Sequence, residues 1–460
     1  MQGSSSSDRA FFDAKDVCGH LLKPGTVYAL LAEHRHRLFP DDLFADLFPV
    51  KRGRPSVPAD VIASVMVLQA LEGLSDREAV GRLETDIRWK IATGLSLMDE
   101  AFHSTVLVLW RNKLRQSESP QRIFDAVRAV ITETGVLKGK HRRALDSTVL
   151  DDAVARQDTV TMLAAQIRKV RKIIPEIAGT WVRHHNLEPG RPPCDWADPA
   201  DRERLVTELV DDALTLLVAV EDLQDGRLVL SDVQEEAVAL LALVAGQDVE
   251  PGDRPGRWRI TRGTAKDRTI STVDPETRHA HKTRRSQRDG YKAHVAAEPD
   301  TGLITGCDLG PGNDGDTQAA PGLLDGDLTA GTVTCPANIT VTISKGRTAT
   351  FGKHCRTCPL RKSCTTAKGG RSISLHEHHQ LLVDARVQAR TPEFDTVYRQ
   401  HRPMIERTIA WLVKDNHRRL RYRGITKNRI AWSQRCAAVN LKRLLNLGLT
   451  HDGGWIIATA

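Results

Sequence analysis

The chain has 460 residues, of which 27% are charged and 5% aromatic, and its formal net charge at pH 7 is +8. This length predicts two or three domains with a sizeable core, and the positive charge favours nucleic acid over a membrane surface as a polyanionic partner. No apolar run approaches the roughly 20 residues of a membrane span, and we expect no secretory signal, because the first residues lack its basic and apolar regions.

Residues 1–50 form a mixed lead-in with a predicted helix near 27–36. The basic, Gly/Pro-broken segment 51–55 reads as a solvated linker or as a contact to a phosphate backbone. A helix is predicted to start at Pro58 and to end at Gly73. Ser75 with Glu78 then fits a capping box for a second helix.

Two helices across a Gly turn resemble a helix-turn-helix, although any αα-hairpin has this pattern. Further helices are expected at 89–95, 102–115 and 123–136. We therefore interpret 51–137 as an N-terminal helical domain of the DNA-binding type.

Asp146 lies in a short β-favouring stretch, Ala144 to Leu150, that follows the basic run His141 to Arg143. A lone carboxylate in an apolar strand is costly unless it is paired or binds a metal. The alternative is that Asp146 caps the turn or helix after the strand.

Helical periodicity returns over residues 153–250, which we interpret as an insertion within a larger fold. A short strand is then expected at 270–273. A β-hairpin is predicted from strands at 291–297 and 303–309, which flank a Thr301-Gly302 turn, and a helix is predicted at 317–324.

Eight cysteines in a chain without a secretory signal argue against a disulfide framework. A Cys-x-x-Cys pair with two flanking cysteines fits a tetrahedral zinc site, and its members are Cys335, Cys355, Cys358 and Cys364. The alternative is a set of reduced structural thiols. His376, His378 and His379 are either replacement ligands or exposed histidines.

A helix is predicted at about 394–414, in which Tyr398, Arg402 and Glu406 recur at every fourth position and so share one face. Arg402 and Glu406 form either a surface ion pair or a site in which Glu406 points inward between basic residues that hold DNA. A last apolar helix is expected at 437–447. The candidate DNA contacts are Arg284, Arg285, Lys292, Arg402, Arg418, Arg419, Arg421 and Arg423.

Four stretches together resemble the DDE transposases of bacterial insertion sequences: GRPSVPADVIASVMVLQALEGLSDREAVGRL, ALDSTVLDDAV, RDGYKAHVAAEPDTGLITG, and YRQHRPMIERTIAWLV with RRLRYRG. The Cys-rich piece also resembles that group. The resemblance implies an α/β fold, namely a ribonuclease H-like mixed sheet flanked by helices, with an N-terminal all-α domain. It places this core at 138–450, with a helical insertion at 153–250, a Cys-rich insertion at 330–370 and a tail at 451–460.

By the same resemblance Asp146 is the first catalytic acid and Glu406 the last, and both bind Mg²⁺ or Mn²⁺; the cysteine spacing adds Zn²⁺ as a second candidate metal. Two metal ions about 3.5–4 Å apart stabilise the attacking and leaving oxygens of phosphodiester cleavage, and hard carboxylates are their ligands. The implied partners are double-stranded DNA, as terminal repeats and target, and a second subunit in a homodimer. No membrane is implied, and the implied location is the bacterial cytoplasm, with nucleoid association when DNA is bound.

The chain departs from the family at the second acid. The family carries it on a strand after the helix expected at 317–324, and no such stretch follows here. Asp325 and Asp327 are weak substitutes, since neither follows an apolar strand. We hypothesise an internal deletion that leaves this copy catalytically defective.

Three functions therefore compete. The first is a metal-dependent DNA strand-transfer enzyme, and the second is a DNA-binding relic without chemistry. The third is a zinc-dependent nucleic-acid-binding module with no transposase history. Metal-dependent nicking separates the first from the others.

Overall fold

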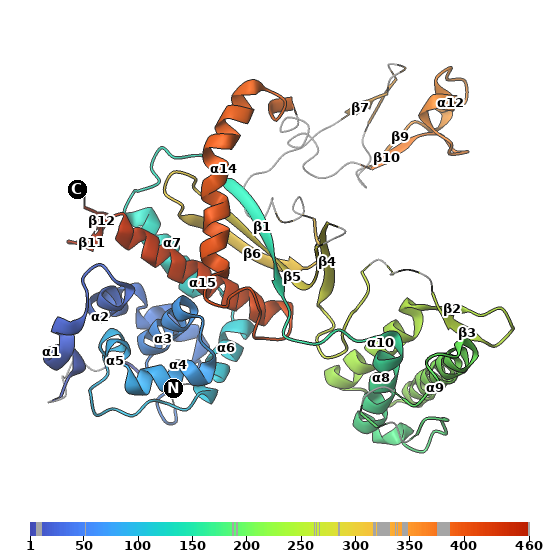
Figure 1. The fold of residues 1–460 in the computed structure, drawn as a ribbon, viewed down its shortest axis with the longest axis horizontal. Helices are drawn as coiled ribbons and strands as arrows, with labels where there is room; N and C mark the ends of the chain where they lie inside the picture. The colour runs from blue at the N-terminus through green and yellow to red at the C-terminus, as the bar shows by residue number, and fades with distance from the viewer. Residues whose placement is uncertain are drawn as a thin grey trace.

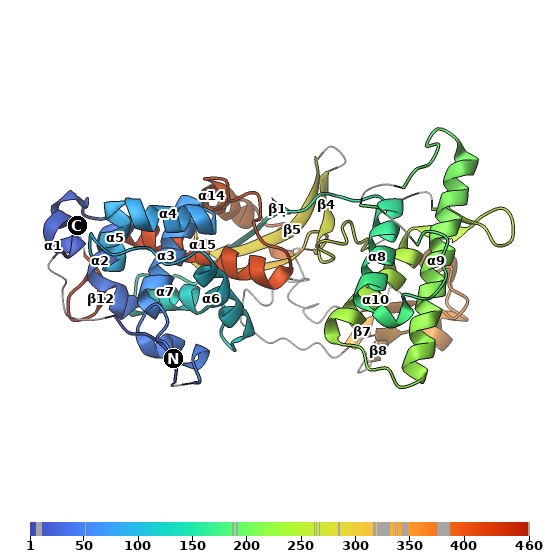
Figure 2. The same ribbon diagram turned by 90° about the horizontal axis from the view of Figure 1, so that it is seen from below.

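The computed structural model describes residues 1–5, 12–50, 52–185, 188–189, 192–261, 263, 265, 267–283, 286–315, 319, 332–335, 337, 339–342, 348–374 and 387–458. Helices and small antiparallel sheets alternate along these residues, consistent with the α/β class (Figures 1 and 2). None of the described helices combines the length and the apolar character that a membrane span requires.

The N-terminal part consists of short helices packed around α3. Its elements are α1 (Ala14–Cys18), η1 (Gly19–Leu21), α2 (Val27–Leu38), η2 (Asp41–Leu47), α3 (Ala59–Glu72), α4 (Asp76–Thr85), α5 (Ile87–Thr93), α6 (Thr105–Gln116) and α7 (Arg122–Glu133). Helix α3 is apolar on all sides, and eleven of its residues, from Ala59 to Gln69, are buried. A helix that is hydrophobic all round belongs in a protein interior, so α3 forms the centre of this part.

The connection from α3 to α4 confirms the predicted boundaries. Gly73 has a φ of 69°, and its N–H donates to the carbonyl of Gln69 at 2.9 Å, which ends α3. Glu78 N–H donates to the Ser75 hydroxyl at 3.3 Å, and Ser75 N–H donates to the Glu78 carboxylate at 2.7 Å. This is the reciprocal capping box that the sequence predicts for α4.

The central sheet contains β1 (Ala144–Asp151), β4 (Arg278–Thr283), β5 (Ser286–Ala297) and β6 (Ile304–Pro311). Strand β5 is its axis. One edge of β5 pairs with β1, so that Asp146 lies opposite Val295, while the other edge pairs first with β4 and then with β6. The β5–β6 hairpin is as predicted, and Glu298 holds its turn by accepting the N–H of Thr301 at 2.8 Å.

An arm is inserted between β1 and β4. Its elements are α8 (Thr159–Ile173), η3 (Pro175–Ile177), α9 (Pro199–Asp225), α10 (Asp232–Gln247), β2 (Val249–Pro251) and β3 (Trp258–Ile260). These elements bury an apolar core of their own, which includes Leu163, Leu209 and Leu241. In Figures 1 and 2 the arm lies beyond β4, at the opposite end of the molecule from the N-terminal helices.

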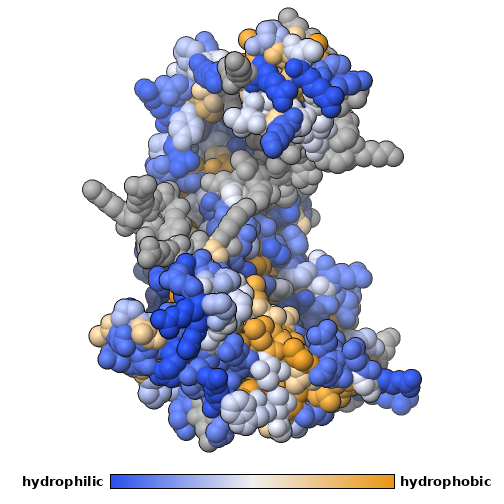
Figure 3. All heavy atoms as spheres, turned by 90° about the vertical axis from the view of Figure 1, so that its right-hand side faces the viewer, coloured by the Kyte–Doolittle hydropathy of each residue, from blue (hydrophilic) through white to orange (hydrophobic). Residues whose placement is uncertain are grey.

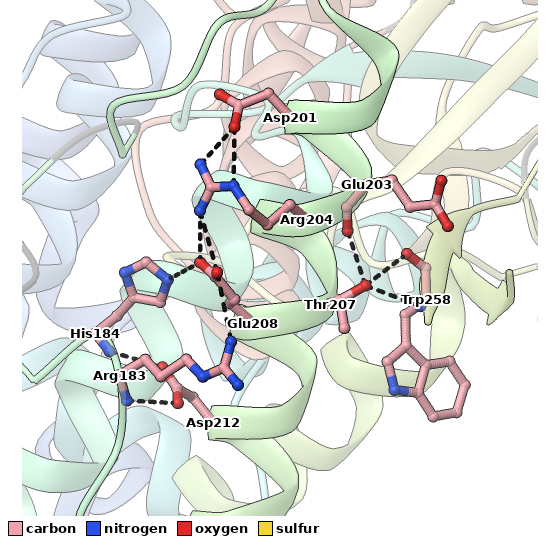
Figure 4. Close-up of polar contacts among 9 residues, drawn as sticks. All are labelled: Arg183, His184, Asp201, Glu203, Arg204, Thr207, Glu208, Asp212 and Trp258. Carbon is pink, nitrogen blue, oxygen red and sulfur yellow. Dashed lines mark hydrogen bonds and ion pairs between the residues drawn. The ribbon is translucent and has the colours of Figure 1, made fainter. Parts of the chain in front are cut away.

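Polar contacts to α9 close the arm (Figure 4). The buried carboxylate of Asp212 accepts the backbone N–H groups of Arg183 and His184 at 2.8 and 2.9 Å, which fixes the loop before α9. The hydroxyl of Thr207 accepts the N–H of Trp258 at 3.0 Å and so ties β3 to the helix. The outward side of the arm, in the lower half of Figure 3, shows apolar patches among polar side chains.

The Cys-rich segment contains two small two-stranded antiparallel sheets. Its elements are β7 (Thr332–Thr334), β8 (Thr340–Thr342), β9 (Thr348–Thr350), η4 (Gly352–Cys355), α12 (Arg361–Cys364) and β10 (Ser372–Ser374). Strand β7 pairs with β8, and β9 pairs with β10. Figure 1 shows this segment at the upper right, above the arm and to the right of the upper end of α14.

The C-terminal elements are α14 (Pro392–Val413), α15 (Ile425–Asn446), β11 (Leu449–His451) and β12 (Trp455–Ile457). Helix α15 begins well before the predicted 437, directly after Gly424, because Glu276 accepts the N–H of Ile425 at 2.8 Å. It packs against β6, α3 and α7. One apolar core therefore joins the N-terminal helices, the sheet and the C-terminal helices.

Buried polar side chains of α15 fix this arrangement. The Asn440 amide exchanges two hydrogen bonds of 2.8 Å with the backbone of Ile304 at the start of β6. The guanidinium of Arg435 donates to carbonyl oxygens at the C-termini of both α3 and α14, including those of Ala70 at 2.7 Å and Trp411 at 2.6 Å. The last carbonyls of a helix lack intrahelical partners, so one buried cation satisfies two helix ends.

Two expectations differ from the structure. The segment 270–273 is not a strand, because one residue, Gln157, takes the place of a strand partner: its N–H donates to the carbonyl of Ile270 at 2.9 Å, and its side-chain amide oxygen accepts the N–H of Thr272 at 2.7 Å. The described sheet is antiparallel throughout, and a parallel partner of β1 appears only as a single bridge between Asp151 and Arg419. The helix expected at 317–324 lies outside the described residues except for Ala319.

Candidate active site

The two predicted acids meet at one guanidinium. Helix α14 crosses β1 in Figure 1, and Arg402 on that helix contacts both carboxylates. Its Nη2 lies 3.3 Å from Asp146 Oδ2, and its Nε donates to Glu406 Oε1 at 2.9 Å. Residues 256 positions apart in the sequence, Asp146 and Arg402, are thus brought into contact by the packing of a helix on a strand.

Helical spacing determines the direction in which these side chains project from α14. Ile405, Thr408 and Leu412 are buried on one side of α14 and fasten it to the core. Tyr398, Arg402 and Glu406 recur at every fourth residue and so lie on a neighbouring face. The expected ion pair between Arg402 and Glu406 is present, and the same Arg402 side chain also reaches inward to the strand.

The exposure of the three side chains is graded. The Asp146 side chain is 17% exposed, that of Arg402 30% and that of Glu406 59%. Burial lowers the pKa of Arg402, but the hydrogen bond to Glu406 and the charge of Asp146 outweigh burial, so the net shift of that pKa is upward. The guanidinium therefore remains a cation between two acids.

Asp146 and Glu406 supply two carboxylate ligands for a divalent metal. Both carboxylates contact one guanidinium, Asp146 at its Nη2 and Glu406 at its Nε, and carboxylate oxygens are the ligands that a hard divalent cation takes. No third His, Cys, Asp or Glu joins them within the part of the chain that the structure describes. The weak substitutes Asp325 and Asp327 lie outside that part.

The other nearby acids are engaged elsewhere. Asp151, at the end of β1, binds Arg288 at 2.7 Å. Asp308, on β6, binds Arg429 at 2.7 Å. Neither carboxylate is therefore in the group around Arg402.

The basic segment after α14 lies alongside the end of β1. Asp151 N–H donates to the carbonyl of Arg418 at 2.8 Å, and Leu420 N–H donates to the carbonyl of Asp151 at 2.8 Å. The Arg418 guanidinium bonds to Thr148 Oγ1 at 3.3 Å, and that of Arg421 donates to the carbonyl of Gly73. These two side chains are thus part of the local structure.

Arg419 and Arg423 differ from these neighbours. Both are exposed, and neither side chain has a hydrogen-bond or ion-pair partner among the described residues. They are free to contact a phosphate backbone. Lys292 bonds to the carbonyl of Asp314 at 3.0 Å, and Arg284 and Arg285 lie outside the described residues.

The sequence did not identify a second contact between the two acidic elements. Arg142 lies in the basic run before β1, and its Nη1 is 3.1 Å from Nε2 of His401 on α14. His401 Nδ1 lies 3.6 Å from Asp300 in the β5–β6 turn. The basic run was visible in the sequence, but nothing there indicated its partner.

The four clustered cysteines are free and surround one cavity of about 240 Å³, lined by Cys335, Cys355, Cys358 and Cys364. The Arg371 N–H donates to Cys355 Sγ at 3.4 Å. His354 also lines the cavity, whereas His376, His378 and His379 lie outside the described residues. Within the described residues these thiols do not come close enough to form a metal site.

Fold and site together define the class: an α/β protein in which a strand carboxylate and a helix carboxylate converge on one cation. A family model for a transposase domain (DUF772) matches residues 20–113, and one for a transposase DDE domain matches residues 334–445. The two matches support the assignment of the chain to the insertion-sequence DDE transposases. No curated protein and no solved structure matches the chain.

The matches place some of the site within the family. The DDE match contains the cysteines, α14 with Glu406, and most of α15, while the first match covers α2 to α6. Asp146 lies outside both matches, so its role depends on the geometry around Arg402. The family implies a DNA substrate and dependence on a divalent metal.

Proposed function

We propose that this protein binds the ends of an insertion sequence and catalyses metal-dependent DNA cleavage and strand transfer, with Asp146 and Glu406 as metal ligands. The observation that carries the proposal is the convergence of both carboxylates on Arg402. Two acids from distant chain segments are the donors that a hard divalent cation requires. Bound Mg²⁺ or Mn²⁺ would supply stabilisation of charge on the scissile phosphate.

The chain's own part in this chemistry is positioning. Strand β1 holds Asp146 on the sheet, where its Oδ1 accepts the N–H of Ser147 at 2.9 Å and its Oδ2 faces α14. Helix α14 brings Glu406 to the same guanidinium, where its Oε1 accepts from Arg402 Nε at 2.9 Å. In the reaction, the oxygen of water or of a 3′-hydroxyl loses its proton to solvent and forms a bond to phosphorus as the bond to the leaving oxygen breaks, and the leaving oxygen takes up a proton from solvent.

The proposal includes a ribonuclease H-like core. The order β1–β5–β6, antiparallel with the acid on the first strand, agrees with the antiparallel half of such a sheet. The remaining strand, with the second Asp, would come from the segment after β6, most of which lies outside the described residues. We retain the hypothesis of an internal deletion in that segment.

A second function is favoured by the count of acids. Two carboxylates, and no third in the described residues, fit a protein that binds element ends but cuts them poorly or not at all. The two transposase matches speak against the third function, a nucleic-acid-binding module with no transposase history.

The deciding experiment is cleavage of the element's own end DNA by the full chain with Mg²⁺ or Mn²⁺. Asp146→Asn removes one ligand without changing the size of the side chain, and Asp308→Asn is the control, because Asp308 lies on the same sheet and binds Arg429. Cleavage that is lost only in Asp146→Asn supports the enzyme. Wild-type protein that retains DNA in a gel shift without cutting supports the non-catalytic function, and cutting unaffected by Asp146→Asn overturns the site.

DNA contact is proposed through Arg419 and Arg423, beside the end of β1, together with Lys292, Arg284 and Arg285. Joining two DNA ends requires two active sites, so we also propose a homodimer on DNA. Light scattering of the protein with and without end DNA measures the mass of each species. A protein that remains monomeric on paired ends contradicts the dimer.

We further propose that Cys335, Cys355, Cys358 and Cys364 move together to bind one Zn²⁺, because all four line one cavity. Metal analysis of the purified chain should find one zinc per chain. Cys358→Ser should lose it, and Cys194→Ser, a free cysteine in the arm, should keep it. Absence of zinc from protein purified without chelators contradicts this site.

A further inference from the structure

Arg402 bridges the two carboxylates that are proposed as metal ligands. Its two contacts, 3.3 Å to Asp146 and 2.9 Å to Glu406, come from different nitrogens of one guanidinium. We propose that Arg402 is an internal counter-ion that keeps the two carboxylates together without metal, and that a divalent metal binds only by displacing it from Asp146. This inference rests on the proposed function.

The graded exposure explains why a counter-ion is needed. Asp146 is the more buried acid, and a half-buried strand carboxylate without a partner is costly. Its Oδ1 is satisfied by the N–H of Ser147, whereas its Oδ2 faces Arg402. In the protein without metal, Arg402 therefore stabilises the carboxylate that the metal would otherwise neutralise.

By the same geometry, the Arg402 guanidinium and a divalent metal ion cannot both contact Asp146. A divalent ion bound to both carboxylates would lie against the guanidinium, and like charges at that separation repel. Arg402 has somewhere to go, because its Cζ lies 5.9 Å from the ring centroid of Tyr398, one turn back along α14 and 47% exposed. A guanidinium is stabilised over an aromatic face. Rotation toward solvent would thus free Asp146 while Arg402 keeps one contact.

Competition predicts a gain of metal affinity when Arg402 is removed. The expected size is about three- to tenfold, the range of a partly buried charge-assisted pair. Arg402→Gln removes the charge and shortens the side chain, while a polar amide remains at its end. Arg399→Gln is the matched control, because Arg399 lies on the same helix, is 78% exposed and pairs with Asp395 at 2.8 Å.

The test is a titration of the full chain with Mn²⁺. Binding is measured by calorimetry and by the electron paramagnetic resonance signal of free Mn²⁺. We expect Arg402→Gln to bind Mn²⁺ more tightly, Arg399→Gln to match wild type, and Arg402→Lys to lie between. Unchanged or weaker binding by Arg402→Gln overturns the inference. Asp146→Asn separates the two proposals: if it leaves Mn²⁺ binding intact, the metal site itself is wrong.

Thermal unfolding gives a second readout that does not depend on activity. Metal that binds only the folded state raises Tm more when it binds more tightly. Without metal, Arg402→Gln should unfold at a lower temperature than wild type, because Asp146 has lost its counter-ion. Saturating Mn²⁺ should raise the Tm of Arg402→Gln by more than it raises the Tm of wild type. Equal Mn²⁺-induced shifts in the two proteins contradict competition.

Discussion

The guanidinium of Arg111 lies 2.7 Å from the carboxylate of Asp76, and both side chains are largely buried. A second nitrogen of Arg111 donates to the Gln69 amide oxygen at 2.6 Å, and Arg111 also stacks 4.8 Å from the ring centroid of Tyr422. The pair therefore connects α6 to the start of α4 and to the segment that follows α14. Its loss would disturb the N-terminal helices and the C-terminal segment together.

We predict that Arg111→Met lowers the free energy of unfolding by about 3 kcal/mol, because it leaves the Asp76 carboxylate buried without its cation. Arg128→Met is the control. This arginine is 51% exposed and lies 3.6 Å from Asp125, a longer distance than in the Arg111–Asp76 pair, so its removal should cost less than about 0.5 kcal/mol. Urea unfolding followed by circular dichroism measures both. Equal losses in the two variants would contradict the prediction.

Gly73 supports a substitution test on the α3–α4 connection. Its φ of 69° disfavours a side chain, and a Cβ there would collide with the carbonyl oxygen of Asp415. Gly73→Ala should therefore destabilise the protein by at least about 2 kcal/mol.

Gly81→Ala is the matched control for this test. Gly81 lies inside α4, and a methyl group on its Cα would meet no atom within 4 Å, so alanine there should add up to about 1 kcal/mol. Unfolding midpoints of the two variants should move in opposite directions. A destabilised Gly81→Ala variant would contradict the reasoning.

His417 predicts a pH dependence of stability. Burial, and then the nearby charge of Arg435, lower the pKa of His417 from 6.5 to about 4. Between these values the unfolded chain binds the proton and the folded chain does not, so stability falls as pH decreases from about 6.5 to about 4. Above about pH 6.5 His417 is neutral in both states, so this loss of stability is absent.

His417→Gln should flatten this part of the stability curve, whereas His103→Gln, at the exposed start of α6, should leave it unchanged. Unfolding midpoints measured at intervals from pH 4 to pH 8 give the comparison. A wild-type slope in the His417→Gln variant would assign the effect to other groups.

Arg419 and Arg423 predict a change in the salt dependence of DNA binding. Each phosphate contact on B-form DNA adds about 0.9 to the slope of log affinity against log salt. Arg419→Gln and Arg423→Gln should each reduce that slope by about one and weaken binding regardless of sequence. Arg259→Gln, which removes the same charge from the distant β2–β3 hairpin, should keep the wild-type slope.

Local signals in the sequence predicted local structure well. The capping box of Ser75 and Glu78, the break at Gly73 and the hairpin turn at Thr301-Gly302 each depend on a few neighbouring residues, and each is confirmed. The strand of Asp146 and the helix of Glu406 are also where they were predicted. Short-range hydrogen bonding and periodicity determine such features.

Contacts between distant segments could not be predicted in this way. The pairing of Arg402 with Glu406 follows from helical spacing, but its contact with Asp146 requires knowing how α14 lies on β1. Arg435 gave no signal at all, since an arginine in an apolar helix reads as a surface residue until the two helix ends beneath it are known. The 270–273 segment likewise bonds to the backbone and side-chain amide of Gln157 in place of a strand partner.

The arm has a consequence for the kinetics of folding. Strands β1 and β5 pair across a long stretch of intervening chain, and closing so large a loop is slow and entropically costly. The arm has its own core, however, and its two ends meet where Gln157 N–H donates to the carbonyl of Ile270 at 2.9 Å. Once the arm has collapsed, the two strands are separated by only two short tethers, so early formation of the arm turns a distant encounter into a near one and accelerates assembly of the sheet that carries Asp146.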